Sequence, residues 1–206
     1  GVTQMYLKNF NLSEKATFDG FDKLRSITRS FVFISQNEST RFAAEGCIDV
    51  LRAANNLIGQ EVYTWTNAID LESKLANNRC STNQTLVLAG GIFDPWCVAP
   101  KDLPKVRCQL RSAARVCVIG SAIFVPISVA MFKTEKTSVH PQFRAAVKER
   151  GYSCEFHYEN TCHQSSISSA VSPAAAIEMI IHFVGALDGN FIANALRTHL
   201  GISSAH

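Results

Sequence analysis

The stretch Arg115-Val-Cys-Val-Ile-Gly-Ser-Ala-Ile-Phe124 determines the class of fold that the sequence predicts. Its first five residues are mostly apolar and β-branched, which is typical of a strand buried on both faces of a sheet. Gly120 follows this run directly, and an apolar helical segment begins after it. We therefore expect a strand, a sharp turn and a helix in immediate succession.

Short apolar strands and longer helices alternate in the same way on the N-terminal side of this stretch. Ile48, Leu51 and Ala54 recur at helical spacing, and Gly59 stands where a helix stop belongs. Strands are expected at 31–35, 61–66, 85–89 and 115–119, with helices at 42–58 and 103–114. Because such βαβ units take right-handed crossovers, they predict an α/β, doubly wound fold with a mainly parallel sheet and helices on both faces.

The second half of the chain continues with less regular elements. Ser172-Pro173 predicts a strong helix start, because serine caps free N–H groups and proline at the first helical position loses no hydrogen bond. This helix is expected to run to about residue 187, and Gly201 is expected to end the last one. The remaining elements are expected to be helices at 122–132, 142–150 and 191–200 and short strands at 154–157 and 164–168.

The length and composition favour one large domain. A chain of 206 residues with 47% apolar residues can bury a substantial core, and we place the domain at 30–201 after an N-terminal arm at 1–29. The longest apolar stretch, 122–132, is much shorter than the roughly 20 residues that span a bilayer. No apolar segment follows a basic start as in a signal peptide. We expect a cytoplasmic protein with no membrane partner.

Charge and cysteine content exclude two further classes. A net charge of +3 is too small and too dispersed for a module that grips nucleic acid by itself. The seven cysteines are odd in number and irregularly spaced. Packed, reduced thiols are therefore favoured over a disulfide framework.

Glycines at two strand ends predict the position of a ligand cleft. Gly90-Gly91 and Gly120 end neighbouring strands, and doubly wound sheets bind ligands just outside these carboxyl ends. A strand-to-helix turn also directs backbone N–H groups at the cleft, so we expect a cradle for an anion or a carbonyl group. The candidate ligand-binding residues are Gly90, Gly91, Ile92, Trp96, Gly120, Ser121 and His140.

Aromatic residues follow the same strand ends. Trp96, Phe93 and Phe124 could wall the cleft and would then suit a cationic ligand such as a quaternary ammonium compound. The alternative is that they pack in the core.

The cluster Cys154, His157, Cys162 and His163 contains the atoms of a zinc site. On an extended strand, however, 154 and 157 point to opposite faces, and adjacent 162 and 163 cannot easily converge on one ion. We therefore expect packed thiols and no metal. Glu178, in the middle of an apolar helix, is expected to be paired or to face the cleft, because an unpaired buried carboxylate is costly.

Residues 31–200 resemble the PfpI and class I glutamine amidotransferase-like superfamily, and in particular the sensor domain of bacterial AraC-family transcriptional regulators. The order and spacing of several segments carry this resemblance. They are Phe42-Ala-Ala-Glu-Gly-Cys-Ile-Asp-Val-Leu-Arg-Ala-Ala-Asn55, Tyr63-Thr-Trp65, Leu86-Val-Leu-Ala-Gly-Gly91, the turn at Gly120, Thr137-Ser-Val-His-Pro141 and Ala175-Ala-Ile-Glu-Met-Ile-Ile-His182. The resemblance implies a flavodoxin-like sheet.

In the enzymes of that superfamily the turn carries a nucleophilic cysteine, with a histidine beside it, an acid on the first helix and paired glycines in an oxyanion hole. Here the resemblance places the cysteine position on Gly120 and the acid position on Ala43. Glycine has no attacking atom, so we expect no enzyme activity. The alternative is a hydratase, glyoxalase-like hydrolase or amidase that uses Ser121 and His140, although the flanking glycines of a serine elbow are missing.

The resemblance implies a non-catalytic small-molecule-sensing and dimerisation domain of an AraC-family regulator. We expect a homodimer without a cofactor, an amino-acid-like or quaternary ammonium effector, and DNA contact only through a helix-turn-helix domain beyond residue 206. A purely structural dimerisation domain with an occluded cleft is a further alternative.

Overall fold

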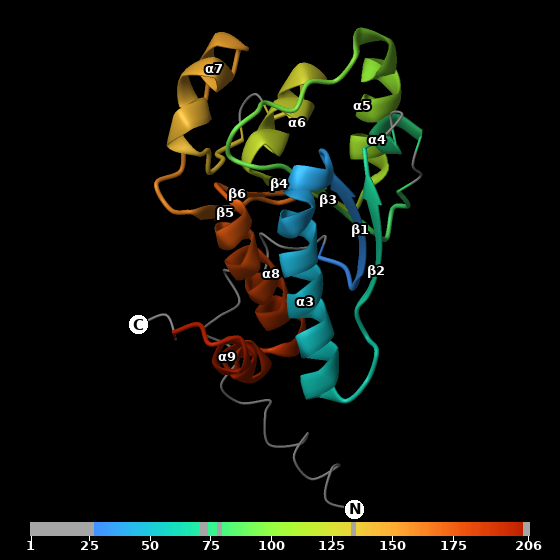
Figure 1. Cartoon of the computed structure of the whole chain (residues 1–206), viewed down its shortest axis with the longest axis vertical. Helices are drawn as coiled ribbons and strands as arrows, with labels where there is room; N and C mark the ends of the chain where they lie inside the picture. The colour runs from blue at the N-terminus through green and yellow to red at the C-terminus, as the bar shows by residue number, and fades with distance from the viewer. Residues whose placement is uncertain (1–26, 71–73, 78–79, 133–134, 204–206) are drawn as a thin grey trace, which may run out of the picture.

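One mainly parallel sheet of six strands, in the order β2-β1-β3-β4-β6-β5, forms the centre of the molecule (Figure 1). The computed structural model describes residues 27–70, 74–77, 80–132 and 135–203. The strands are β1 (Ser30–Ser35), β2 (Thr64–Ile69), β3 (Thr85–Ala89), β4 (Arg115–Ile119), β5 (Thr161–His163) and β6 (Ile167–Ala170). Only the β5–β6 pair is antiparallel. The predicted doubly wound α/β fold is confirmed.

The central strands lie where their apolar runs predict them. β3 and β4 are buried along their whole length and pair in register, with Thr85 opposite Arg115. β2 begins three residues later than predicted for a strand at 61–66. The reason is that the Asn55 amide holds both backbone groups of Tyr63, accepting from its N–H and donating to its oxygen at 2.9 Å. Residues 61–63 therefore lie in the connection between Gly59 and β2 and not in the strand.

Two long helices cover one face of the sheet, and a third helix packs against both of them. They are α3 (Arg41–Ile58), α8 (Pro173–Asp188) and α9 (Asn190–His199). α3 ends at Gly59, whose φ of 77° is left-handed, and α8 begins with the Ser172 hydroxyl accepting from the N–H of Ala175 at 3.3 Å. Both predicted helix boundaries are therefore confirmed.

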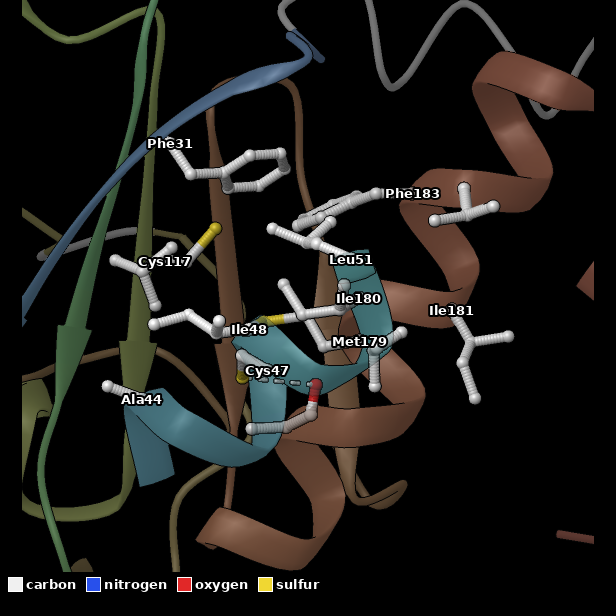
Figure 2. Close-up of a cluster of buried hydrophobic side chains, with 14 of the residues drawn as sticks. Phe31, Ala44, Cys47, Ile48, Leu51, Cys117, Met179, Ile180, Ile181 and Phe183 are labelled. Atoms are coloured by element: carbon white, nitrogen blue, oxygen red, sulfur yellow. Dashed lines mark hydrogen bonds between the residues drawn. The ribbon is translucent and has the colours of Figure 1, made fainter. Parts of the chain in front are cut away.

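Apolar side chains of α3, α8 and the sheet form the core on this face (Figure 2). Phe31 from β1, Leu51 from α3 and Phe183 from α8 are fully buried in it. The Cys47 thiol also lies there and donates to the carbonyl oxygen of Ala176 at 3.9 Å. It is one of seven free cysteines.

Four shorter helices cover the opposite face, where a second core surrounds Val32, Leu88 and Val118. They are α4 (Lys74–Asn77), α5 (Leu103–Ser112), α6 (Phe124–Ser128) and α7 (Arg144–Glu149). The helix predicted at 122–132 is wrong in both bounds. Residues Gly120–Ile123 form a 3₁₀ turn, and after α6 the chain turns with positive φ at Ala130 and Phe132.

The short strand predicted at 154–157 is also wrong, and the strand predicted at 164–168 is shifted, since β6 begins at Ile167 and ends at Ala170. The segment 154–157 contributes only an isolated bridge between Phe156 and Thr137. Residues 164–166 form a turn between β5 and β6, because the Arg115 guanidinium donates to the backbone oxygens of Gln164 and Ser165 at 2.9 and 2.6 Å. A strand through residue 164 could not offer both oxygens to one side chain.

Asp188, the last residue of α8, links this helix to the residues that directly precede β1 and β2. Its carboxylate accepts hydrogen bonds from Arg29, directly before β1, at 2.8 Å and from the hydroxyl of Tyr63, directly before β2. The Arg29 guanidinium also lies over the Tyr63 ring. The end of α8 is thus fixed to the amino ends of both strands.

β1 lies between β2 and β3, so the strand order reverses there, which is the position where doubly wound folds bind ligands. Of the predicted N-terminal arm, residues 1–26 lie outside the described residues. Within the described part of the chain, no helix is both long and apolar enough to cross a bilayer.

Candidate functional site

The turn after β4 brings together the glycines that the sequence analysis singled out. Gly120 has a φ of +54°, and a Cβ at this position would lie well under 3.0 Å from the carbonyl oxygen of Gly91. A Cβ at Gly90 would also lie under 3.0 Å from the Ser121 hydroxyl oxygen. Position 120 therefore accepts only glycine in this backbone, because any side chain would collide with another backbone segment.

Ser121 closes the turn by two hydrogen bonds to Gly91. Its N–H donates to the Gly91 oxygen at 2.8 Å, and its hydroxyl accepts from the Gly91 N–H at 3.0 Å. Ser121 is fully buried. The turn is thus present as predicted, but both backbone donors of the expected cradle already have acceptors inside the protein.

Gln36, which the sequence analysis missed, completes this hydrogen-bond network. Its side-chain oxygen accepts from the Ser121 hydroxyl at 2.7 Å, and its amide nitrogen donates to the backbone oxygens of Asp94 and Pro95 at 3.3 and 3.4 Å. Gln36 directly follows β1 at the point where the strand order reverses. A search for polar residues directly after each predicted strand would have found it.

The other two predicted ligand-binding residues outside the turn and the core, Ile92 and His140, have different surroundings. Ile92 is partly exposed beside Gly91. His140 caps the 3₁₀ turn Pro141–Phe143, where its Nδ1 accepts from the N–H of Gln142 at 3.3 Å. Among the described residues, no hydrogen bond joins His140 to Ser121.

The three aromatic residues near the strand ends do not form one wall. Trp96 is 3% exposed and packs in the second core, where its indole N–H donates to Asp70 at 3.2 Å. Phe124 is also buried there, whereas Phe93 is 75% exposed. Trp96 and Phe124 therefore pack in the core, as the alternative predicts. Of the three aromatic residues, only Phe93 remains free to contact a ligand.

The side chains of the Cys154/His157/Cys162/His163 cluster have separate partners and do not converge on one point. The Cys162 thiol is buried and donates to the backbone oxygen of Lys136 at 3.3 Å, whereas the His163 ring stacks on His182 from α8. Within residues 27–70, 74–77, 80–132 and 135–203, no three His, Cys, Asp or Glu side chains come together as they would around a metal ion.

A cavity of about 540 Å³ opens at the edge of the sheet beside β5, α8 and α9, which we call the edge cavity. None of the predicted ligand-binding residues lines it. Its walls are polar and include two carboxylates, two cations and three histidine rings. The lining residues are Lys136, His157, Glu159, Thr161, Cys162, His163, Gln164, Glu178, His182 and Arg197. Sequence reasoning noticed four of them but did not bring them together with Lys136, His182 and Arg197.

Glu178 is paired, as the sequence predicts. Its two carboxylate oxygens accept from Arg197 of α9 at 2.8 and 2.5 Å. This bidentate ion pair forms one wall of the edge cavity and joins α8 to α9.

Two stacked histidines form another wall. The rings of His163 and His182 lie 4.1 Å apart at 16°. Burial lowers the pKa of His163 to about 3, helped by the neighbouring His182 and Arg115. His182 is exposed on its outer side, yet the burial of its stacked face, followed by Arg115 and Arg197, lowers its pKa as well. Both rings are therefore neutral at pH 7.

Arg115 lies behind this pair and is fully buried. Its guanidinium donates to the Ser168 hydroxyl at 2.9 Å, and that hydroxyl lies 3.0 Å from His163 Nδ1. The Arg115 Nε has no hydrogen-bond partner among the described residues. A positive charge is thus held directly behind the neutral histidines.

A second cavity of about 150 Å³ lies beside α4 and α5 and is lined partly by Asp70, Cys97 and Asp102. It is too small for most metabolites, since ligand clefts measure about 300–1,000 Å³.

Comparison with known proteins places this architecture in one class of fold. Neither a protein-family model nor a curated protein sequence matches the chain. A crystal structure of an AraC family transcriptional regulator from Pseudomonas putida matches with a TM-score of 0.69 at 19% identity, over 83% of this chain and 98% of that chain. The chain therefore has the doubly wound fold of that regulator structure.

Structures of DJ-1 and PfpI type share the same fold. Drosophila melanogaster DJ-1beta matches with a TM-score of 0.60 at 15% identity, over 86% of this chain and 100% of that chain. A ThiJ/PfpI domain protein from Brachyspira murdochii gives a TM-score of 0.57 at 14% identity, over 78% of this chain and 97% of that chain. The resemblance noted in the sequence is thus confirmed at the level of the fold.

Proposed function

We propose that this chain is a non-catalytic, small-molecule-sensing and dimerisation domain of an AraC-type transcriptional regulator. The observation that carries the proposal is Gly120, which the resemblance places at the position of the superfamily's nucleophile and which leaves no room for a side chain. Covalent catalysis requires an attacking atom at that point, and glycine supplies none.

The hydrogen bonds of the turn support the same proposal. An oxyanion hole needs N–H groups that are free to donate to the reacting oxygen. Here the Gly91 N–H donates to the Ser121 hydroxyl, and the Ser121 N–H donates to the Gly91 oxygen. The Ser121 hydroxyl is buried and donates to Gln36 rather than to a histidine base, which argues against the alternative enzyme that uses Ser121 and His140.

We favour sensing over a purely structural role because the chain combines the fold of the Pseudomonas putida regulator with a cavity. A sensing domain acts by binding its effector more tightly in one arrangement of the dimer than in the other. The edge cavity gives the chain a polar space of the size that small metabolites occupy.

Thermal unfolding of the 206-residue chain with a panel of metabolites tests this proposal against the enzyme. We expect at least one compound to raise the melting temperature, because a ligand that binds only the folded state stabilises it. The same samples are assayed for turnover of small amides and glyoxals, where we expect none. Turnover that disappears in Ser121→Ala would establish the enzyme instead.

Dimerisation is tested separately by sedimentation velocity with and without the stabilising compound. A homodimer whose sedimentation changes when the compound binds is the expected result. A chain that remains monomeric under all conditions would contradict the dimerisation part of the proposal.

A further inference from the structure

The charged side chains that line the edge cavity balance in number, two cations against two carboxylates, so the potential inside depends on a charge behind the wall. Glu178 and Arg197 neutralise each other by their bidentate pair. Lys136 is exposed and forms no ion pair with any described residue, while the Glu159 carboxylate is 61% exposed and 3.5 Å from His157. Water screens both exposed groups, so neither Lys136 nor Glu159 by itself sets the potential deep inside the cavity.

Buried Arg115 adds a positive charge behind the cavity wall. Its hydrogen-bond acceptors are a hydroxyl and two backbone oxygens, and no described carboxylate forms an ion pair with it. A buried charge without a counter-ion produces a strong local field, because little water is present to screen it. The field acts across Ser168 and His163 towards the cavity.

The protonation of His163 and His182 is sensitive to this positive field. The pKa of each ring is lowered by burial and by neighbouring cations, Arg115 among them. An anion in the cavity would oppose both cations and make protonation of the rings favourable. The exposed His182 ring can therefore take up a proton when an anion binds and become an additional donor to it, whereas His163 is harder to protonate because its pKa starts at about 3.

We propose that the edge cavity binds a small metabolite with a carboxylate or phosphate group, held by Lys136 and the His163–His182 pair, and that this anion is the effector. This identification of the site rests on the sensing function proposed above. A cationic compound, such as the quaternary ammonium ligand expected from the aromatic residues, does not fit beside Lys136 and the uncompensated Arg115.

Histidine NMR titrations with succinate and with inorganic phosphate as probes test the proposal directly. Without a probe, we expect His163 to remain neutral down to about pH 5. A bound anion should raise the pKa of His163 and His182 by about 0.5 unit or more. The ring signals of His140 and His199, which do not line the cavity, should not move when the probe is added at constant pH. The spectra of His163→Gln and His182→Gln assign the signals, and a larger response to one probe shows which oxyanion the site prefers.

A lysine pair provides the matched control. Lys136→Gln removes the unpaired cation of the cavity, whereas Lys105→Gln removes an exposed cation of α5 on the other face of the sheet. We expect Lys136→Gln to weaken probe binding about fivefold or more and Lys105→Gln to leave it unchanged. Affinity should also rise as the pH falls from about 7.5 to 5.5, since binding is coupled to protonation of His182, while His163 stays neutral over this range.

Two results would overturn the anion site. The first is an unchanged titration of His163 and His182 in the presence of both probes. The second is equal binding by the Lys136→Gln and Lys105→Gln proteins. If choline or another panel compound still raised the melting temperature, the sensing function would stand and only its site and ligand class would be wrong. If no compound did so, both proposals would fail.

Discussion

Ser121 and Gly91 exchange two hydrogen bonds across the turn after β4, at 2.8 Å from the Ser121 N–H and 3.0 Å from the Gly91 N–H. This exchange joins the ends of β3 and β4 and uses donors that an enzyme of this fold would offer to its substrate. Stability at the turn and the proposed loss of catalysis therefore have a common physical origin.

A side chain at position 120 should destabilise the fold more than one at another left-handed glycine. Gly120→Ala is expected to lower the free energy of unfolding by about 3 kcal/mol or more, because backbone strain adds to the collision with Gly91. Gly59 has a φ of +77° with open space around it, so Gly59→Ala should cost only about 1 kcal/mol. Urea unfolding of both variants measures the difference, and equal costs would refute the collision.

Loss of the Ser121 hydroxyl should weaken the turn without a large change of shape. Ser121→Ala leaves the Gly91 N–H and the Gln36 oxygen without a partner, which should cost about 1–2 kcal/mol of the free energy of unfolding. The control is Ser39→Ala, an exposed serine whose hydroxyl bonds only to Asn37. Chemical denaturation compares the two, and a neutral Ser121→Ala would show that the network adds no net stability.

Acid should destabilise the protein partly through His163. Its pKa is about 3 in the folded protein and near 6.5 when unfolded, so the unfolded chain binds more protons between these values. The stability due to the neutral ring is therefore complete above about pH 6.5 and is lost as the pH falls towards 3, by roughly 2 kcal/mol at pH 5. Urea unfolding at about pH 7.5 and 5 measures this loss, and His163→Gln should reduce it. An equal loss in the variant would assign the effect to other groups.

Thiol reactivity should separate the cysteines by burial. Cys97 and Cys108 are exposed, whereas Cys47 and Cys117 are fully buried. Burial raises the pKa of Cys117 to about 12 and also raises that of Cys47, so neither forms much thiolate near pH 8. Brief iodoacetamide treatment and peptide mass spectrometry should find label on Cys97 and Cys108 alone of these four. Rapid labelling of Cys47 in the native protein would contradict the core packing.

The central sheet could be predicted from the sequence because its signals are local. The apolar runs 85–89 and 115–119 define β3 and β4 without reference to any other segment. The same holds for the end of α3 and the start of α8, where the capping residues Gly59 and Ser172 are next to the helix in sequence. Such features need no knowledge of distant contacts.

The elements that could not be predicted depend on contacts between distant residues. The bend at 164–166 follows from the side chain of Arg115, about fifty residues earlier. The late start of β2 follows from the Asn55 side chain. Local patterns do not report either contact, so the strands next to them were misplaced.

The candidate site was predicted only in part for the same reason. The turn around Gly90, Gly91, Gly120 and Ser121 was located because glycines mark it. The edge cavity was missed because its residues come from four separate segments between Lys136 and Arg197. Trp96 was placed at the cleft by its position after a strand, although its apolar surface buries it in the core.

The carboxylate of Asp188 holds three segments of the chain together at one point. It holds the end of α8 to Arg29 and Tyr63, so that this helix and the first two strands are expected to behave as a single rigid block. α9 follows across Gly189, whose φ of 90° is open to few other residues, and reaches back to α8 through Arg197. An effector that competes for Arg197 would thus loosen the last helix from an immobile support, and any domain attached after it would inherit that movement as a change of angle.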